Sequence, residues 1–209
     1  MRKTTIFGLA VAGVVAVMLF TKSAAEAQQE QGLNNLLRGE YAFSGEAACL
    51  VSDEGFNADL TPINTAAPFP FVRSFSVQGV VTFKGDGTAR RVVRVVSIRH
   101  PTATTGVGSA SSADIEADAT YHVAPDRSFT VATTALNGTV LTGPRAGQTF
   151  TIANFPDLVG LISQDHKTLT VAHHEPTIET QTYSNGAVFH RICHRSRMAI
   201  KLKNGDGTE

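Results

Sequence analysis

The residues best suited to chemistry lie near the end of the chain, in a strand-like segment at about 187–202. Two histidines, His190 and His194, stand four residues apart there. Side chains on a strand alternate between its faces, so both histidines share a face with the apolar residues of even number. Cations occupy odd positions: Arg191, Arg195, Arg197, Lys201 and Lys203. This alternation predicts that the histidines point into the core and that the cations form a solvated outer row.

A third histidine, His173, follows Leu169 and Val171 on another predicted strand, and we expect it to face the same interior. Residues four apart on a strand are separated by about 13 Å, which is too far for His190 and His194 to share one ion. The chain also lacks Cys-x-x-Cys and His-x-His pairs. We therefore predict no metal site. The histidines are either ordinary interior residues or polar groups that orient a ligand.

No familiar catalytic motif accompanies these histidines. The chain has no Gly-x-Ser-x-Gly elbow, no Ser-x-x-Lys and no phosphate-cradling loop. The acidic residues on predicted strands, Glu40, Glu46, Glu116 and Asp118, show no spacing typical of an acid–base pair, and Asp86 between two glycines indicates a turn. The sequence therefore predicts neither catalytic residues nor a cofactor.

The elements that must position these residues are almost all strands. One short apolar helical turn is predicted, from Gly32 to Leu37. Alternation is clearest at 73–84, where Phe75, Val77 and Phe83 share one face. Long loops are expected at 52–72 and 101–115, and a tight hairpin at 84–88. The predicted strands cover about 40–50, 73–84, 89–99, 116–123, 128–140, 148–153, 157–163, 168–174, 177–184 and 187–202.

Such a series of eight to ten consecutive antiparallel strands has no βαβ unit, so its edges must be covered in another way. Closure into a single up-and-down β-barrel removes the edges, which makes an all-β barrel the expected fold. A β-sandwich is the alternative.

The opening of the domain resembles that of lipocalin-type (calycin) barrels. Those barrels begin with a short helical turn and a Gly-x-Trp motif, and an arginine of the last strand packs over the tryptophan. Here Gly39 and Tyr41 match that motif with tyrosine in place of tryptophan, and Arg191, Arg195 or Arg197 would supply the cation. The chain contains no tryptophan.

A wider resemblance connects residues 39–203 with secreted bacterial proteins that are similar to lipocalins and to allene-oxide-cyclase-like barrels. It is carried by a Gly-x-Tyr-x-Phe opening that ends at Phe43, by the hairpin glycines at 79–87, and by a Tyr-x-Val-x-Pro-Asp turn that begins at Tyr121. This resemblance implies a barrel fold and says little about function.

The first 27 residues indicate a cleavable signal peptide. Arg2 and Lys3 precede an apolar run at 6–20 that is shorter than the roughly 20 residues of a spanning helix, and Ala25 and Ala27 fit an A-x-A cleavage site. We expect a mature chain from Gln28, exported to the periplasm or the extracellular space, with no transmembrane segment. Residues 28–38 would be a lead-in, 39–203 the barrel, and 204–209 a tail.

The charge balance of the predicted mature chain argues against nucleic acid as a partner. The precursor has 18 basic and 18 acidic side chains, and cleavage would leave 15 and 17. Nucleic-acid-binding domains usually carry a net positive charge and a basic patch.

Export also makes a disulfide between Cys49 and Cys193 chemically reasonable, since the two lie near the two ends of the predicted barrel. The alternation creates a conflict, however. Cys49 shares its face with Tyr41 and Phe43, which we expect inside, whereas Cys193 falls on the predicted outer face. A bulge near Gly45 would reconcile the two.

These observations favour an exported barrel that binds a small apolar or amphipathic molecule without catalysis. The candidate lumen residues are Tyr41, Phe43, Phe75, Val77, Phe83, Tyr121, His173, His190 and His194. A barrel-type cyclase or isomerase, using His190, His194 and Tyr121, is an alternative. A cell-envelope interaction protein, with contacts from the two long loops and a patch at Phe69, Phe71 and Val72, is another.

Overall fold

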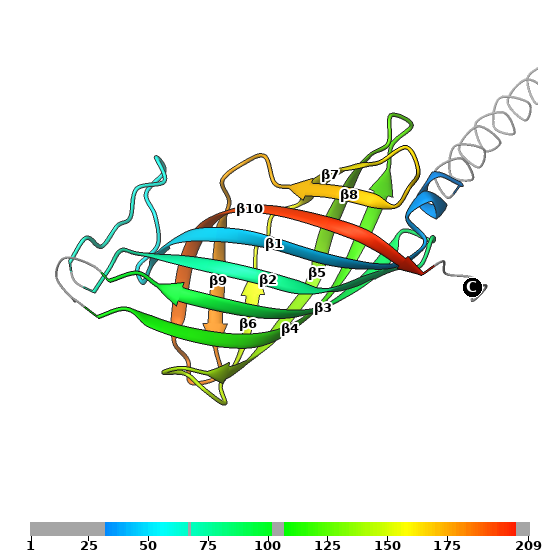
Figure 1. Cartoon of the computed structure of the whole chain (residues 1–209). Coiled ribbons are helices and arrows are strands. Elements are labelled where there is room, and N and C mark those ends of the chain that lie inside the picture. The colour runs from blue at the N-terminus through cyan, green and yellow to red at the C-terminus, as the bar shows by residue number, and fades with distance from the viewer. Residues whose placement is uncertain (1–31, 67, 102–106, 204–209) are drawn as a thin grey trace, which may run out of the picture.

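A computed structural model describes residues 32–66, 68–101 and 107–203, and almost all of this part is antiparallel β-structure (Figure 1). The signal peptide predicted at 1–27, the start of the lead-in and the tail at 204–209 lie outside the described residues. The elements are η1 (Asn35–Leu37), β1 (Gly39–Ser52), β2 (Phe71–Phe83), β3 (Thr88–Arg99), β4 (Ser109–Val123), β5 (Ser128–Thr142), β6 (Thr149–Ala153), β7 (Leu158–Ile162), β8 (Thr168–Ala172), β9 (Ile178–Tyr183) and β10 (Val188–Lys203).

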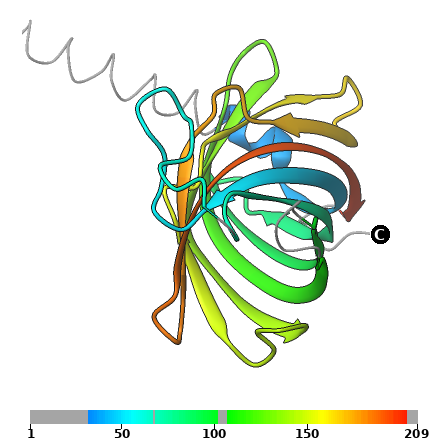
Figure 2. The same cartoon turned by 90° about the vertical axis from the view of Figure 1, so that its left-hand side faces the viewer.

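The strands form one closed ring, which confirms the predicted all-β barrel. Strands β1 to β5 follow one another as an up-and-down meander, and β10 returns to pair with β1 over most of its length. Between β5 and β10 the wall is built from two separate strand pairs, β6 with β9 and β7 with β8. Figure 2 views the molecule along the barrel.

The split of the wall begins on β5, which pairs with β7 at Ser128–Val131 and with β6 at Asn137–Thr139. Between these two stretches the β4–β5 register shifts, so that Ala119 pairs with Thr133 whereas Asp118 pairs with Ala135. Such a bulge bends a strand and re-aims its side chains. The inward residues of β5 accordingly change from odd to even numbers, and Thr133 lies at the change.

Each of the two β5 pairings contains a glycine that is covered by a phenylalanine. Gly138 pairs with Phe150, and Phe129 pairs with Gly160. A Cβ atom on Gly138 would lie 2.2 Å from the Phe150 ring, and one on Gly160 would lie 2.4 Å from the Phe129 ring. The missing side chains therefore let two aromatic rings fill the inside of the wall where it divides.

One end of the barrel, the plugged end, is covered by η1, which lies within the predicted helical turn. Leu37 is fully buried against the core. The Asn34 side chain accepts a hydrogen bond from the Val123 amide, and the Tyr121 hydroxyl donates to the Asn34 carbonyl. The opposite end, the loop end, carries the long segment at 53–70 (Figure 1).

The predicted hairpin at 84–88 is present at the plugged end. The Lys84 amide donates to the Thr88 carbonyl, and both glycines of the turn have φ near +90°. The Asp86 carboxylate accepts hydrogen bonds from the Thr88 amide and hydroxyl, which is the role of a turn residue.

The predicted orientation of the final strand was wrong, and the structure reverses it. The cations Arg191 and Arg195 are buried, each with 7% of its surface exposed, whereas Met198 and Ile200 are more than half exposed. His194 is likewise exposed, and His190 is half-buried. The apolar residues of even number therefore face outward, and the arginines of odd number face inward.

The disulfide between Cys49 and Cys193 is present, and it explains this reversal. The two residues are direct partners in the β1–β10 ladder, and both are buried. The pairing near Gly45 is regular, so the proposed bulge there was wrong. Cys49 shares the inner face with Tyr41 and Phe43, as expected, and Cys193 joins it because the whole inner face of β10 is the odd one.

The two predicted loops are shorter than expected. Strand β4 begins at Ser109, so most of 101–115 belongs to a strand or lies outside the described residues. At the end of the other loop, Phe71 begins β2 and is buried, and Phe69 packs against Phe71 and Phe189. Only Val72 of the predicted apolar patch is exposed. Within the described ranges, no helix is long and apolar enough to cross a membrane.

Candidate functional site

The candidate site is a cavity inside the barrel, lined by residues from most of the strands. Its volume is about 90 Å³, and it extends from the middle of the barrel toward the loop end. Its wall is largely apolar, with Val93, Ile115, Leu136, Phe150 and Tyr183 among the residues that form it. A smaller apolar cavity of about 40 Å³ lies on the plugged side, against Phe83 and Leu169.

Arginines separate and line these two cavities. Arg91 and Arg197 border both of them, and Arg191, Arg195 and Arg73 border the larger one. We call Arg91, Arg191, Arg195 and Arg197 the lumen arginines. Glu179 faces them from β9 and is the only buried carboxylate among the described residues. The interior therefore contains several guanidinium groups and one opposing negative charge.

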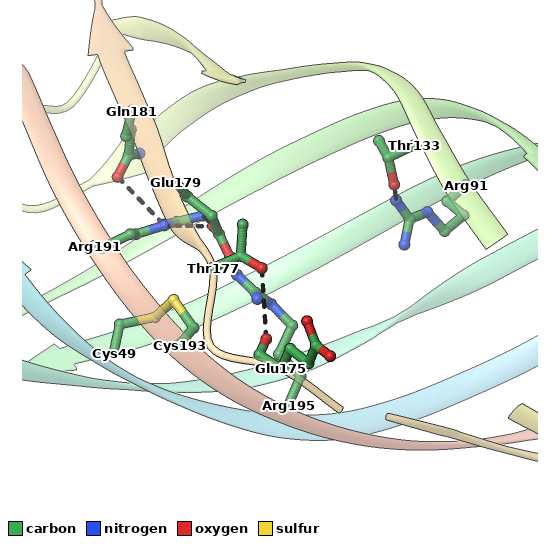
Figure 3. A network of polar contacts seen from close by, with 10 residues as sticks. All are labelled: Cys49, Arg91, Thr133, Glu175, Thr177, Glu179, Gln181, Arg191, Cys193 and Arg195. Atoms are coloured by element: carbon green, nitrogen blue, oxygen red, sulfur yellow. Dashed lines mark hydrogen bonds and ion pairs between the residues drawn. A yellow bond between two sulfur atoms is a disulfide. The ribbon is translucent and has the colours of Figure 1, made fainter. Parts of the chain in front are cut away.

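Glu179 is held by two neighbouring arginines of β10 (Figure 3). Its Oε2 accepts a hydrogen bond of 2.9 Å from the Arg191 Nε, and its Oε1 forms an ion pair of 2.5 Å with the Arg195 Nη2. Arg191 also donates through Nη1 to the Gln181 side chain. The carboxylate is fully buried, so this pair of contacts compensates charges that have no access to water.

Arg91 reaches the same region from β3 on the opposite side of the lumen. Its Nη2 donates a hydrogen bond of 2.7 Å to the Thr133 hydroxyl, which the bulge in β5 turns inward. The Phe155 ring belongs to the segment between β6 and β7. Its centre lies 4.5 Å from the Arg195 guanidinium carbon and 5.5 Å from that of Arg91. The Phe155 ring therefore packs near both guanidinium groups.

Arg197 has room inside because Gly45 lies opposite it on β1. A Cβ atom on Gly45 would lie 2.6 Å from the Arg197 Cγ. The Arg197 guanidinium lies 5.7 Å from the centre of the Phe43 ring. A glycine in the wall thus allows a long cationic side chain to extend across the first strand.

Several donor groups of these arginines have no hydrogen-bond partner within the described part of the chain. They are the Nε atoms of Arg91 and Arg197 and the Nη1 atom of Arg195. Buried polar groups are usually paired, and an unpaired one costs about 1–3 kcal/mol. The Arg73 Nε and the Glu179 Oε1 also lack a hydrogen bond, so the interior contains several buried polar atoms that are not satisfied within the described chain.

Burial and mutual repulsion both oppose the positive charges. Burial lowers the pKa of Arg91 to about 10, and repulsion from Arg195 acts in the same direction. Burial also lowers the pKa of Arg197 to about 9, with repulsion from Arg91 and Arg195 adding to it. The pKa of Arg195 is lowered by burial as well, and the nearby Glu179 opposes that shift. A negative charge in the lumen would relieve all three arginines.

The aromatic and aliphatic residues predicted for the lumen do point inward, but they do not all border the larger cavity. Phe75 and Val77 border it, and Phe43 and Phe83 border the smaller one. Tyr41 and Tyr121 belong to the core of the plugged end, where the Tyr41 hydroxyl donates to the His166 carbonyl. Lys201, rather than an arginine, packs over the Tyr41 ring, at 5.7 Å from its centre.

None of the three predicted histidines borders either of these two cavities. His190 is half-buried, and its Nδ1 is 3.3 Å from the Thr180 hydroxyl. His173 and His194 border a groove on the outer side of β10, next to Glu175. Neither His190 nor His194 therefore comes near Tyr121. The residues named for an isomerase do not form one site.

The inward position of the arginines could have been predicted from the sequence. The 84–88 hairpin pairs Phe83 with Ala89, so an inward Phe83 also places Arg91 inside. In the same way, a disulfide from the inward Cys49 places Cys193 inside, and Arg191 and Arg195 with it. Glu179 lies on a short strand whose register has no such marker.

This arrangement of arginines, one glutamate and apolar walls can offer hydrogen-bond donors and positive charge inside an apolar cavity. Guanidinium groups donate hydrogen bonds and remain protonated, so they do not serve as general bases. Among the described residues, no group of three or more histidine, cysteine, aspartate or glutamate side chains is placed to hold a metal ion. No family model matches the chain, and no curated protein is significantly similar to it.

Proposed function

We propose that this protein is an exported β-barrel that binds one small amphipathic molecule in its lumen. The observation that carries the proposal is the cavity of about 90 Å³, whose apolar wall is combined with a few inward polar groups. Binding sites for small molecules have this character: a mostly apolar hollow with a small number of polar groups that fix orientation. Barrels of this size hold a single small ligand.

Export is supported by the Cys49–Cys193 bond, which links two buried residues across the β1–β10 ladder. Disulfides of this structural kind persist in oxidising compartments and are rare in the cytosol. The signal-like sequence at 1–27 points the same way. Sequencing the N-terminus of protein recovered from outside the cytoplasm should give Gln28, and an intact Met1 in that fraction would contradict cleavage.

The binding proposal is tested by native mass spectrometry of the mature protein, purified without denaturation. We expect a mass excess that corresponds to one small molecule and that disappears after denaturation and refolding. The refolded protein should then bind hexan-1-ol, a small amphipathic probe, with NMR shifts confined to amides that border the cavity.

A matched pair of variants on β4 separates the lumen from the outer surface. Ala117 borders the cavity and is 4% exposed, whereas Ala110 faces outward. We expect Ala117→Phe to fill the cavity and abolish probe binding, while Ala110→Phe leaves it unchanged. Absence of both a co-purifying molecule and probe binding in the folded wild type would refute the proposal.

A further inference from the structure

We propose that the ligand is an organic acid whose carboxylate is held by Arg91, Arg195 and Arg197, with its apolar body against the wall of the larger cavity. This inference rests on the proposed function, and it adds the chemical class of the ligand. A neutral apolar molecule would fit the apolar wall of the cavity, but it would bring no negative charge and no hydrogen-bond acceptor to these arginines.

The lumen contains more positive than negative charge among the described residues. Glu179 already accepts a hydrogen bond from Arg191 and forms an ion pair with Arg195, so its negative charge is shared between these two residues. Arg91 and Arg197 have no carboxylate partner among the described residues. Charges that are removed from water without a partner are costly, so buried charges are normally paired. The lumen therefore lacks negative charge on the side where Arg91 and Arg197 lie.

The lumen arginines that carry the unpaired donors all border the larger cavity. The Nε of Arg91 and the Nη1 of Arg195 belong to side chains that are more than nine-tenths buried, and both arginines border the same cavity. Both guanidinium carbons lie within 5.5 Å of the centre of the Phe155 ring. Arg197, two residues beyond Arg195 on β10, also borders this cavity and carries an unpaired Nε. The arginines that carry the unpaired donors therefore border the cavity from β3 and β10.

A carboxylate suits these donors better than a hydroxyl or a carbonyl group. Its two oxygens offer about four acceptor positions, and planar guanidinium groups match them in pairs. Such charge-assisted hydrogen bonds are about twice as strong as neutral ones. One carboxylate could accept from Arg91 and Arg195 while it neutralises Arg197.

The volume limits the size of the acid. One water-sized position takes about 10–15 Å³. A cavity of about 90 Å³ therefore contains roughly six to nine such positions. This corresponds to a compact acid such as hexanoate or benzoate rather than to a long-chain lipid. Val93, Leu136 and Phe150 would contact its apolar part.

The test compares hexanoate with hexan-1-ol, which has the same carbon chain without the charge. Both are titrated into refolded protein and followed by NMR. We expect hexanoate to bind about 10- to 100-fold more tightly, since hydrogen bonds to charged groups are worth more than neutral ones. Equal affinities would overturn the inference while leaving the proposed function intact. Binding of neither probe would overturn both.

Arg197→Met tests the role of the arginine, because it removes the charge but retains an unbranched side chain. The variant should stay folded, since Arg197 has no ion-pair partner among the described residues and the contact that it would lose is the one with the Phe43 ring. We expect its affinity for hexanoate to fall at least about 10-fold, with hexan-1-ol unaffected. Arg197→Lys, which keeps the charge, should recover part of the loss.

Arg94→Met is the matched control, because Arg94 lies on the outer face and pairs with Asp114. It should bind hexanoate as the wild type does. Should Arg197→Met fail to fold, Arg91→Met makes the same test from the opposite wall. Unchanged preference for hexanoate over hexan-1-ol in a folded Arg197 or Arg91 variant would refute the assignment of the carboxylate to these arginines.

Discussion

Replacing Glu179 with glutamine removes the negative charge that faces the lumen arginines while keeping almost the same shape. The glutamine can still accept a hydrogen bond from Arg191 or Arg195, but it cannot neutralise either. Both arginines are 7% exposed, so water cannot solvate them in place of the carboxylate. We expect Glu179→Gln to be strongly destabilising.

The magnitude follows from the burial of all three groups. Breaking a buried pair by removing one partner costs roughly 3–5 kcal/mol, because it leaves an uncompensated buried charge. Here two guanidinium groups lose their partner at once, with contacts of 2.9 and 2.5 Å to the two carboxylate oxygens. The upper part of that range is therefore the expected loss in the free energy of unfolding.

The assay is equilibrium unfolding in urea, with the same substitution at Glu116 as a control. Glu116 pairs with Arg90 on the outer face, where the two side chains are 61% and 57% exposed. An exposed pair of this kind contributes about 0–1 kcal/mol, so Glu116→Gln should change little.

Hexanoate adds a second measurement to this experiment. If a carboxylate ligand supplies negative charge to the lumen, it should raise the stability of Glu179→Gln more than that of the wild type. Surface substitutions usually change the free energy of unfolding by no more than about 0.5 kcal/mol. If Glu179→Gln and Glu116→Gln lower it by amounts that agree within this range, the view that Glu179 neutralises buried arginines is refuted.

Three other perturbations test the frame around the site. Replacing both Cys49 and Cys193 with serine removes a cross-link between residues 144 positions apart. The loop entropy released in the unfolded chain predicts a loss of about 5 kcal/mol at most in the free energy of unfolding. Urea unfolding without reductant measures this loss, and equal stability of variant and wild type would contradict a structural role for the bond. Burial, followed by repulsion from a neighbouring tyrosine, raises the pKa of Tyr41 to about 12, so its contribution is complete below pH 10 and is lost as the pH rises to 12. The wild type should accordingly lose up to roughly 2–3 kcal/mol more than Tyr41→Phe over that interval, and parallel pH profiles would argue against it. Gly160→Ala should cost about 1–3 kcal/mol, because its Cβ would overlap the Phe129 ring, and an unchanged melting temperature would show that the ring can move aside.

Several elements of the barrel could be predicted because hydrophobic alternation and turn residues agreed. On β2, Val77 and Phe83 are buried, as the alternation indicated, and the glycine hairpin after them is present. On β4, Tyr121 also points inward as predicted. In these strands the more apolar face points inward, so the rule that assigns the apolar face of a strand to the interior gave the right orientation.

The same rule failed on β10, where the lumen requires charge inside and the outer face tolerates apolar residues. Met198 and Ile200 are 53% and 56% exposed, while Arg191 and Arg195 are buried. Alternation alone cannot identify a polar lumen, because it assigns the more apolar face to the interior. Register against a neighbouring strand can identify it, and the Cys49–Cys193 pair carried that information.

The pairing of β1 with β10 also determines when the barrel can form during synthesis. Cys49 and Cys193 are separated by 144 positions, so the first strand leaves the ribosome long before its final neighbour exists. Until β10 arrives, its three partners β1, β8 and β9 present open edges that invite pairing with other chains. Folding of the ring is thus completed only after nearly all of it has been made, and such long-range closure is slow. A carrier that keeps the growing chain extended would protect these edges over that interval.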